Sequence, residues 1–277
     1  MTPVLLAVFS AAAFGAMTVA VRFGMRGEMS ALRSSLATVT VAFTISLAAS
    51  FVRHDYTDAW KFFLAGFLAP GASQLLFTRS IKEVGASRTS VTVGTAPLFA
   101  LAIAFTFLGE PVQAALIAGA LLIVAGGALL VAERDRPGHL HGRGILFALA
   151  AAVTFAIRDN IVRSLHAHGS PETVAAATML AGILVGFAMT RSLPTRHELT
   201  RMAPAGILFG LSYLALFEAY FRGRVSVVSP LVATESLWGV GLAFLVFKHS
   251  EGVGRRLVLG ALVIVAGGAL IGITASQ

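Results

Sequence analysis

The chain has 277 residues, of which 57% are hydrophobic and 12% charged, and its mean hydropathy is +0.84. A soluble domain carries roughly 25% charged residues, so this composition excludes an ordinary soluble protein and indicates that lipid is the solvent for most of the chain. The net charge is +8, but the cations lie in short clusters between apolar stretches, which argues against a nucleic-acid partner and is typical of the loops of membrane proteins.

The apolar stretches are long enough to cross a membrane. A helix needs about 20 residues to cross ~30 Å of hydrocarbon, and lipid-exposed backbone must be helical to satisfy its polar groups. The first stretch has no positive region before it and is predicted to be a retained span, not a signal peptide. In chain order, the predicted fold is an all-α integral membrane protein with ten transmembrane helices, at 3–23, 31–52, 60–81, 88–108, 112–132, 143–164, 172–190, 203–221, 225–247 and 255–274.

Two nearly identical segments indicate an internal repeat. Residues 119–130 read GALLIVAGGALL and residues 260–271 read GALVIVAGGALI, with ten of twelve positions identical. The same offset of 141 residues carries Glu110 onto Glu251, and it places the two copies in the fifth and tenth spans. Because five is an odd number, the second half must enter the membrane from the opposite side. The sequence therefore predicts two inverted five-helix repeats, an arrangement found in secondary transporters.

The polar stretch ERDRPGHLHGR separates the two halves. We expect a first five-helix repeat over 1–132, a polar linker over 133–143 and an inverted second repeat over 144–277. Fifteen of the 21 Lys and Arg residues lie in or beside the odd-numbered loops, and five lie in or beside the even-numbered loops. Positive loops stay in the cytoplasm. The odd-numbered loops are therefore predicted to be cytoplasmic, and both termini to lie outside the inner (plasma) membrane.

Two motifs carry a resemblance to a known family. FLGEP at 107–111 followed by GALLIVAGGALL, and KHSEG at 248–252 followed by GALVIVAGGALI, resemble the EamA-type repeat of the drug/metabolite transporter superfamily; Pro97 also fits the pattern. The resemblance covers essentially the whole chain. The chain is similar to bacterial amino-acid and metabolite exporters, including the aromatic amino-acid exporter group. This implies a central cavity lined by spans one, three, four, six, eight and nine. One departure is that many members are drawn with both termini in the cytoplasm.

Ionisable groups deep in a span are the first candidates for a site, because they are costly unless they face protein or water. Glu235 lies near the centre of the ninth span, and the residue 141 positions earlier is Gly94, so its charge has no counterpart. It could bind a substrate ammonium, carry a coupling proton or join helices as a protonated acid. Arg158, in the sixth span, could bind a substrate carboxylate or pair with Glu235. Asp159 is expected to pair with Arg163 at i,i+4 and to be structural.

Uncharged polar and aromatic side chains within the spans complete the predicted substrate site: Thr18, Gln74, Thr95, Asn160, Tyr213 and Trp238. Trp238 follows Glu235 by three residues and is predicted to form an aromatic wall for an organic amine, with ordinary packing as the alternative. Pro97 and Pro230 lie in the corresponding fourth and ninth spans. Each permits a bend, which could be a gating hinge or a static kink.

The remaining patterns narrow the function. Nucleotide-binding loops, metal clusters, catalytic dyads and cysteines are lacking, so we expect no enzyme, no metal and no cofactor, with proton coupling left open. The sequence predicts a secondary transporter of small organic metabolites, most simply an amino-acid exporter that works by alternating access. Alternatives are export of drugs, small organic cations or nucleotide-related metabolites, and a lipid-processing membrane enzyme. The expected partners are membrane lipid and a small substrate such as an amino acid. The oligomeric state stays open, and a monomer is compatible with the sequence.

Overall fold

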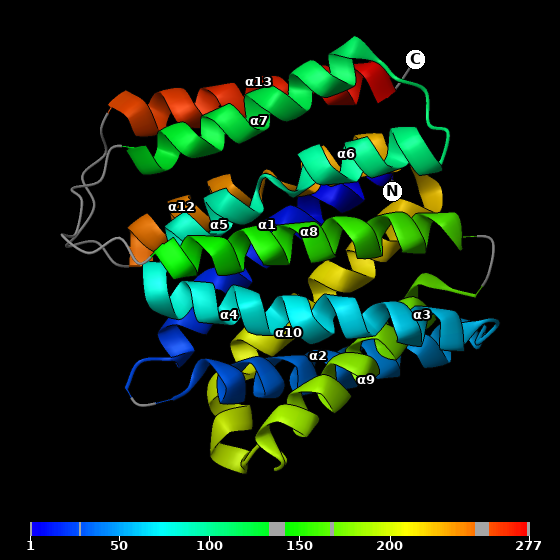
Figure 1. Cartoon of the computed structure of the whole chain (residues 1–277), viewed down its shortest axis with the longest axis vertical. Helices are drawn as coiled ribbons and strands as arrows, with labels where there is room; N and C mark the ends of the chain where they lie inside the picture. The colour runs from blue at the N-terminus through cyan, green and yellow to red at the C-terminus, as the bar shows by residue number, and fades with distance from the viewer. Residues whose placement is uncertain (1, 28, 133–141, 167–168, 247–254, 276–277) are drawn as a thin grey trace.

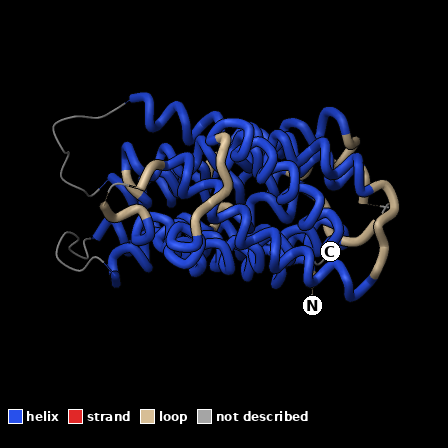
Figure 2. Tube along the Cα trace, turned by 90° about the horizontal axis from the view of Figure 1, so that it is seen from below, coloured by secondary structure: helices blue, strands red, loops and turns tan. Residues whose placement is uncertain are grey.

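The computed structural model describes residues 2–27, 29–132, 142–166, 169–246 and 255–275, and within these ranges the regular structure is helical (Figure 1 and Figure 2). The first half contains α1 (Pro3–Gly24), α2 (Ala31–Arg53), α3 (Ala59–Gly66), the π-helix η1 (Phe67–Ala72), α4 (Ser73–Val84), α5 (Ala86–Val93), α6 (Ala96–Phe107) and α7 (Ala114–Ala132). The second half contains α8 (Gly142–Ser164), α9 (Pro171–Thr190), α10 (Arg196–Arg222), α11 (Val225–Val232), α12 (Glu235–Val246) and α13 (Arg255–Ala275).

These helices form the ten predicted spans. Seven helical stretches in the described residues are long and apolar enough to cross a membrane, and α7 and α13 carry shorter apolar cores. The predicted eighth span, 203–221, lies within α10, which begins at Arg196, seven residues earlier. The reason is a capping box: the Thr195 hydroxyl accepts from the amide of Glu198, and the Glu198 carboxylate accepts from the amide of Thr195. This pair satisfies the first backbone donors and extends the helix.

Spans four and nine are broken in the same way. Span four is α5, a turn at 94–95 and α6; span nine is α11, a turn at 233–234 and α12, and α5 and α11 are each eight residues long. The offset between these spans is therefore 139 residues, not 141, because the chain from the start of α12 to the second motif copy, at residue 260, is two residues longer than that from the start of α6 to the first copy, at residue 119. Two expectations are corrected: Glu235 corresponds to Ala96 rather than to Gly94, and it begins a half-helix rather than lying inside a continuous one.

The contacts between helices are equivalent under the pseudo-two-fold symmetry of an inverted repeat: each contact has a counterpart in which the two repeats change places. α1 packs against α10, and its counterpart α8 packs against α4; α1 packs against α12, and α8 packs against α6. α2 packs against α10, and α9 packs against α3 and η1. The pairs α2–α9 and α7–α13 each join a helix to its own counterpart, and they form opposite edges of the bundle in Figure 1. The pseudo-two-fold axis therefore passes through the middle of the bundle.

The two copies of the repeated motif pack directly against each other. A Cβ atom placed on Gly119 would lie 3.0 Å from the carbonyl oxygen of Gly267, and one placed on Gly126 would lie 2.7 Å from that of Gly260. The contacts run in opposite directions along the two chains, so α7 and α13 are antiparallel. Since Gly119 corresponds to Gly260 and Gly126 to Gly267, the two contacts are equivalent by the repeat. Small residues at these positions allow the backbones to approach closely, as membrane helices require.

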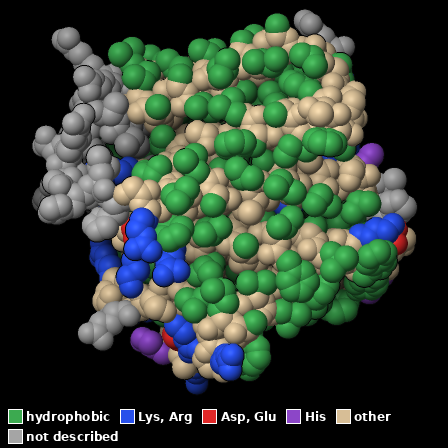
Figure 3. Space-filling view, viewed as in Figure 1, with side chains coloured by type: hydrophobic (Ala, Val, Ile, Leu, Met, Phe, Trp, Pro, Cys, Tyr) green, Lys and Arg blue, Asp and Glu red, His purple; other side chains and the backbone are tan. Residues whose placement is uncertain are grey.

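Charge divides the bundle into two ends. We call the end with the α1–α2, α4–α5 and α9–α10 connections the linker end, and the end with the start of α1 and the α2–α3, α6–α7 and α10–α11 connections the terminal end. Lys and Arg side chains gather at the linker end in Figure 3, and hydrophobic side chains cover the face between the two ends. Leu121, Leu146, Leu262 and Val265 are among the exposed large hydrophobic side chains of the helices. The apolar face between the two ends is the surface that lipid covers.

The close approach of α7 and α13 predicts that Gly126→Ala destabilises the protein. The added Cβ would meet backbone atoms, which cannot move aside as a flexible side chain can, so the free energy of unfolding should fall by about 1–3 kcal/mol. Gly241→Ala is the matched control, because Gly241 also lies in a helix and has open space around it. Unfolding in detergent, followed by circular dichroism, measures both variants. Equal stabilities of the two would contradict the packing described here.

Candidate functional site

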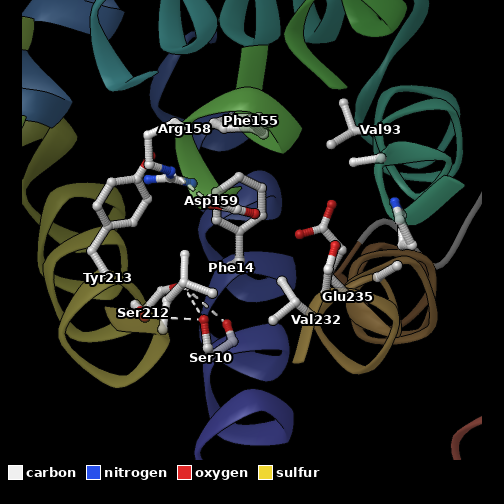
Figure 4. A pocket seen from close by; sticks show the side chains of 15 residues that line it. Ser10, Phe14, Val93, Phe155, Arg158, Asp159, Ser212, Tyr213, Val232 and Glu235 are labelled. Atoms are coloured by element: carbon white, nitrogen blue, oxygen red, sulfur yellow. Dashed lines mark hydrogen bonds and ion pairs between the residues drawn. The ribbon is translucent and has the colours of Figure 1, made fainter. Parts of the chain in front are cut away.

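A narrow cavity lies in the middle of the bundle, beside the breaks in spans four and nine (Figure 4). Its volume is about 40 Å³, room for only one or a few water molecules at ~30 Å³ each. A metabolite can therefore enter only if the helices move apart. The cavity is lined by Ser10, Phe14, Val93, Ala96, Pro97, Phe155, Arg158, Asp159, Ser212, Tyr213, Leu216, Ser229, Val232, Ala233 and Glu235.

Five of the six spans expected to line a cavity contribute to it, and span three does not. The lining comes from α1, α5, α6, α8, α10, α11 and α12, which are spans one, four, six, eight and nine. On α4, in span three, Phe77 packs behind two lining rings, at 5.1 Å from Phe14 and 6.5 Å from Phe155 between ring centroids. These three aromatic rings separate α4 from the cavity.

Arg158 is a buried cation with an unusual set of neighbours. Its side chain is 2% exposed, and its Nε lies 2.7 Å from Oδ1 of Asp159. The guanidinium carbon lies 4.6 Å from the ring centroid of Tyr213, 5.1 Å from that of Phe217 and 5.7 Å from that of Phe155. Nη1 has no hydrogen-bond partner among the described residues. One carboxylate and three ring faces thus hold the charge, and a donor remains for an anionic group.

The predicted pairing of Asp159 with Arg163 is wrong. Asp159 pairs with Arg158 and accepts a hydrogen bond at Oδ2 from the hydroxyl of Tyr220 at 2.7 Å. Arg163 donates from Nη1 to the backbone carbonyl of Tyr220 at 2.9 Å. Adjacent helix residues do not normally face each other, but the long side chain of Arg158 can fold back. The buried cation of Arg158 needs a neutralising carboxylate more than the cation of Arg163 does, because Arg163 lies near the end of α8.

Glu235 enters the cavity from the side opposite to Arg158. It is the first residue of α12, it is 4% exposed, and its Oε1 has no hydrogen-bond partner among the described residues. In Figure 4 its carboxylate points toward the cavity across from Arg158 and Tyr213. No ion pair between described residues joins Glu235 to Arg158, so the two do not pair as internal structure. The N-terminus of α12 provides a dipole that favours a negative charge here.

Two serines that border the cavity fasten α1 to α10. The Ser10 hydroxyl donates to the carbonyl oxygen of Ser212 at 3.0 Å, and the Ser212 hydroxyl is placed to donate to the carbonyl oxygen of Ser10, also at 3.0 Å. Ser212 is a candidate from the sequence as an uncharged polar residue within a span, whereas Ser10 has no distinguishing signal. The two residues are 202 positions apart, so no local pattern could have paired them.

Trp238 lies outside the lining of the cavity, and its part as an aromatic wall stays a prediction. Its side chain is 40% exposed, it is absent from the cavity lining, and its Cβ lies close to Gly15 of α1. Three residues along a helix rotate a side chain by about 300°, which leaves Trp238 about 60° away from Glu235. The two side chains therefore lie on neighbouring parts of the helix surface, and of the two only Glu235 is among the lining residues.

Asn160 fastens α8 to α6. Its Nδ2 donates to the backbone carbonyls of Ala100, at 3.2 Å, and Ala156, at 2.9 Å. Ala100 lies on α6, so the amide links two helices that both border the cavity. Asn160 itself is absent from the lining, and its part in binding substrate stays a prediction.

The other uncharged candidates lie outside the lining as well. Thr18 donates to the backbone carbonyl four residues earlier at 3.0 Å, and Thr95, in the break of span four, to the carbonyl three residues earlier at 2.7 Å. Gln74 is fully buried on α4, and neither of its amide atoms has a hydrogen-bond partner among the described residues. In the described part of the chain, no cluster of three or more His, Asp or Glu residues is arranged to hold a metal.

This architecture, two inverted five-helix halves around a cavity with buried charges, defines a multi-pass membrane protein built as inverted-repeat transporters are. The sequence profile of the EamA-like transporter family matches residues 1–132 and 142–273, and the chain belongs to this family of membrane transporters. A solved structure described only as "Crystal structure of protein" is 18% identical, with a TM-score of 0.81 over 99% of this chain and 97% of that chain. That likeness supports the fold alone. No curated protein matches the chain.

The Arg158–Asp159 pair predicts a large effect when only one charge is removed. Asp159→Asn keeps an acceptor for Tyr220 but leaves the Arg158 cation without its carboxylate, so the free energy of unfolding should fall by about 3–5 kcal/mol. The double variant Arg158→Leu/Asp159→Leu should recover most of that loss, because no buried charge remains. Denaturation in detergent measures all three proteins. A double variant as unstable as Asp159→Asn would contradict this account of the pair.

Proposed function

We propose that the protein is a secondary transporter that exports small zwitterionic metabolites, amino acids above all. The observation that carries the proposal is the pair of opposed charged groups in the central cavity. Glu235 offers a carboxylate oxygen, and Arg158 offers a guanidinium nitrogen, each without a hydrogen-bond partner among the described residues. Ionisable groups inside a membrane bundle commonly mark a transport path.

The two charges match the two ends of an amino acid. The Glu235 carboxylate would accept from the substrate ammonium, and the Arg158 guanidinium would donate to the substrate carboxylate. Tyr213 lines the same cavity, and its hydroxyl is buried without a partner among the described residues, so it could donate to the same carboxylate. The rings that surround Arg158 favour a substrate with an apolar side chain, in keeping with the resemblance to aromatic amino-acid exporters.

Export of small organic cations is the second candidate, and the charge balance favours it. The cavity lining carries one cation, Arg158, and two carboxylates, Asp159 and Glu235, so its net charge is −1 when all are ionised. A monovalent cation would neutralise this charge. A zwitterion would leave it unchanged unless Glu235 took up a proton, which would couple transport to protons. Phosphorylated metabolites fit less well, because they would add negative charge beside two carboxylates.

The broken spans support alternating access. Both breaks, at 94–95 and 233–234, lie beside the cavity and are related by the repeat. Pro97 follows the first break within the first turn of α6, where a missing amide costs nothing. Pro230 lies inside α11, three residues before the second break. We propose that both half-helix pairs bend at these points when the cavity opens toward one side of the membrane or the other.

Substrate chemistry predicts which residue each ligand needs. Phenylalanine, phenethylamine and 3-phenylpropanoate carry both charged groups, only the ammonium and only the carboxylate, respectively. Glu235→Gln should weaken binding of the first two by about tenfold or more. Arg158→Lys should weaken binding of phenylalanine and 3-phenylpropanoate, because Lys keeps the charge but loses the planar fork. Calorimetry in detergent and counterflow in proteoliposomes measure binding and transport.

Asp55→Asn is the matched control for these variants. Asp55 lies in the α2–α3 connection, where its Oδ1 accepts from the Thr57 amide at 3.1 Å, and it is not part of the cavity lining. It should behave like the parent protein. If phenethylamine bound better than phenylalanine and Arg158→Lys had no effect, the organic-cation function would replace the amino-acid one. If no ligand of either kind responded to Glu235→Gln or Arg158→Lys, the proposed site would be wrong.

The charge bias of the loops predicts the orientation, with both termini outside the inner membrane. The chain lacks cysteine, so Gln277→Cys introduces a single thiol. In intact cells it should react with a membrane-impermeant maleimide. His197→Cys, at the exposed start of α10 on the linker end, should react only after the cells are permeabilised. The reverse labelling pattern would mean that the chain is oriented with its termini in the cytoplasm.

A further inference from the structure

A second and larger cavity opens at the terminal end of the bundle. Its volume is about 700 Å³, and its charged lining consists of Arg163, Arg222 and Arg224. The helices α1, α8, α10 and α11 contribute residues both to this cavity and to the central one. Along α8, Arg163 follows Arg158 by five residues, a distance of about 8 Å along the helix axis. We call the larger cavity the terminal vestibule; it lies beyond the central cavity toward the terminal end.

The vestibule concentrates the few cations of its end. By sequence, the terminal end carries only five Lys or Arg residues: Arg53, Lys61, Arg163, Arg222 and Arg224. Three of the five line the vestibule. The other two are neutralised elsewhere, Arg53 by Glu172 and Glu218 and Lys61 by Asp58. The charge bias of the loops does not by itself require that the other three arginines line the same cavity.

The three arginines of the vestibule differ in how many of their guanidinium donors bind protein groups. Arg222 pairs with Glu218. Arg163 uses Nη1 to donate to a backbone carbonyl, and Arg224 forms no ion pair with a described residue. Both therefore have guanidinium donors that no protein carboxylate takes up in the described part of the chain.

Glu110 is the acid that interacts electrostatically with Arg163, and it is already engaged. Its Oε1 accepts from the amide of Val225 at 2.8 Å, and its Oε2 from the amide of Ser226 at 2.9 Å. The carboxylate therefore caps the N-terminus of α11. One carboxylate bound to backbone amides faces two arginines, so the vestibule keeps an excess positive charge.

We propose that the terminal vestibule is an anion-binding site in which Arg163 and Arg224 bind a carboxylate or a phosphate group. The planar guanidinium fork suits both groups. Arg163 is partly buried, and Arg224 is exposed. The anion is either a free solute in the vestibule or the headgroup of an anionic lipid beside it. This site is separate from the Arg158–Glu235 cavity, and its binding does not depend on which substrate that cavity takes.

The test measures anion binding directly, without transport. The full chain is placed in phosphatidylcholine discs, and binding of radiolabelled inorganic phosphate is measured by equilibrium dialysis. Arg224→Gln should weaken binding by about tenfold, and Arg163→Gln/Arg224→Gln should abolish it. Arg196→Gln is the control, because Arg196 is an exposed arginine at the linker end. Arg224→Gln alone keeps the test decisive if loss of the Arg163 hydrogen bond impairs folding.

A second arm identifies the source of the anion. Native mass spectrometry of protein in discs that contain phosphatidylglycerol counts bound lipid in the parent protein and in the same variants. Phosphate binding that Arg224→Gln weakens supports a free solute. Retention of phosphatidylglycerol that Arg224→Gln and the double variant lose supports a headgroup. Equal binding of both probes to the parent protein, Arg224→Gln and Arg196→Gln would overturn the proposal.

Discussion

Hydrocarbon offers no partner to a charge or to a backbone amide, and the rest of this structure depends on that constraint. Helices can break only where the freed groups face protein or an internal space. The breaks at 94–95 and 233–234 both lie beside the central cavity. The buried charge of Arg158 is likewise tolerated only because Asp159 and three aromatic rings surround it. The cost of polar groups in lipid thus places the two related breaks and the buried charges of Arg158, Asp159 and Glu235 beside one internal cavity.

The repeat determines how the helices pack, and the charged residues of the cavity lie at positions where the two repeats differ. The α7–α13 contact and the paired breaks obey the two-fold relation closely, and both are made of small or apolar residues. The charges do not obey it. Glu235 corresponds to Ala96, and Arg158 corresponds to Met17 or Val19 at offsets of 141 or 139 residues. A symmetric scaffold can open to either side of a membrane, while an asymmetric pair of charges gives a bound zwitterion one orientation.

Some structural features that were not predicted have a local sequence pattern that indicates them, and others have none. Thr195 and Glu198 have the spacing of a capping box, so the early start of α10 was predictable. Pro97 fits the first turn of a helix better than its middle, a local sign of the break in span four. By contrast, the pairing of Asp159 with Tyr220 joins residues 61 positions apart on different helices. Nothing in the sequence around Asp159 indicates that it accepts a hydrogen bond from Tyr220 instead of pairing with Arg163.

The sequence by itself determined the solvent, the ten spans and the inversion of the halves. Each follows from quantities local to the chain: the apolar length needed to cross lipid, the repeated motif and the odd number of helices between its copies. Only the tertiary structure decided which charges face each other. That outcome depends on how each helix is rotated about its axis and on which helices become neighbours, and both are set by side-chain packing across the whole bundle. A two-residue difference in the number of residues between the broken span and the repeated motif was enough to move the counterpart of Glu235 from Gly94 to Ala96.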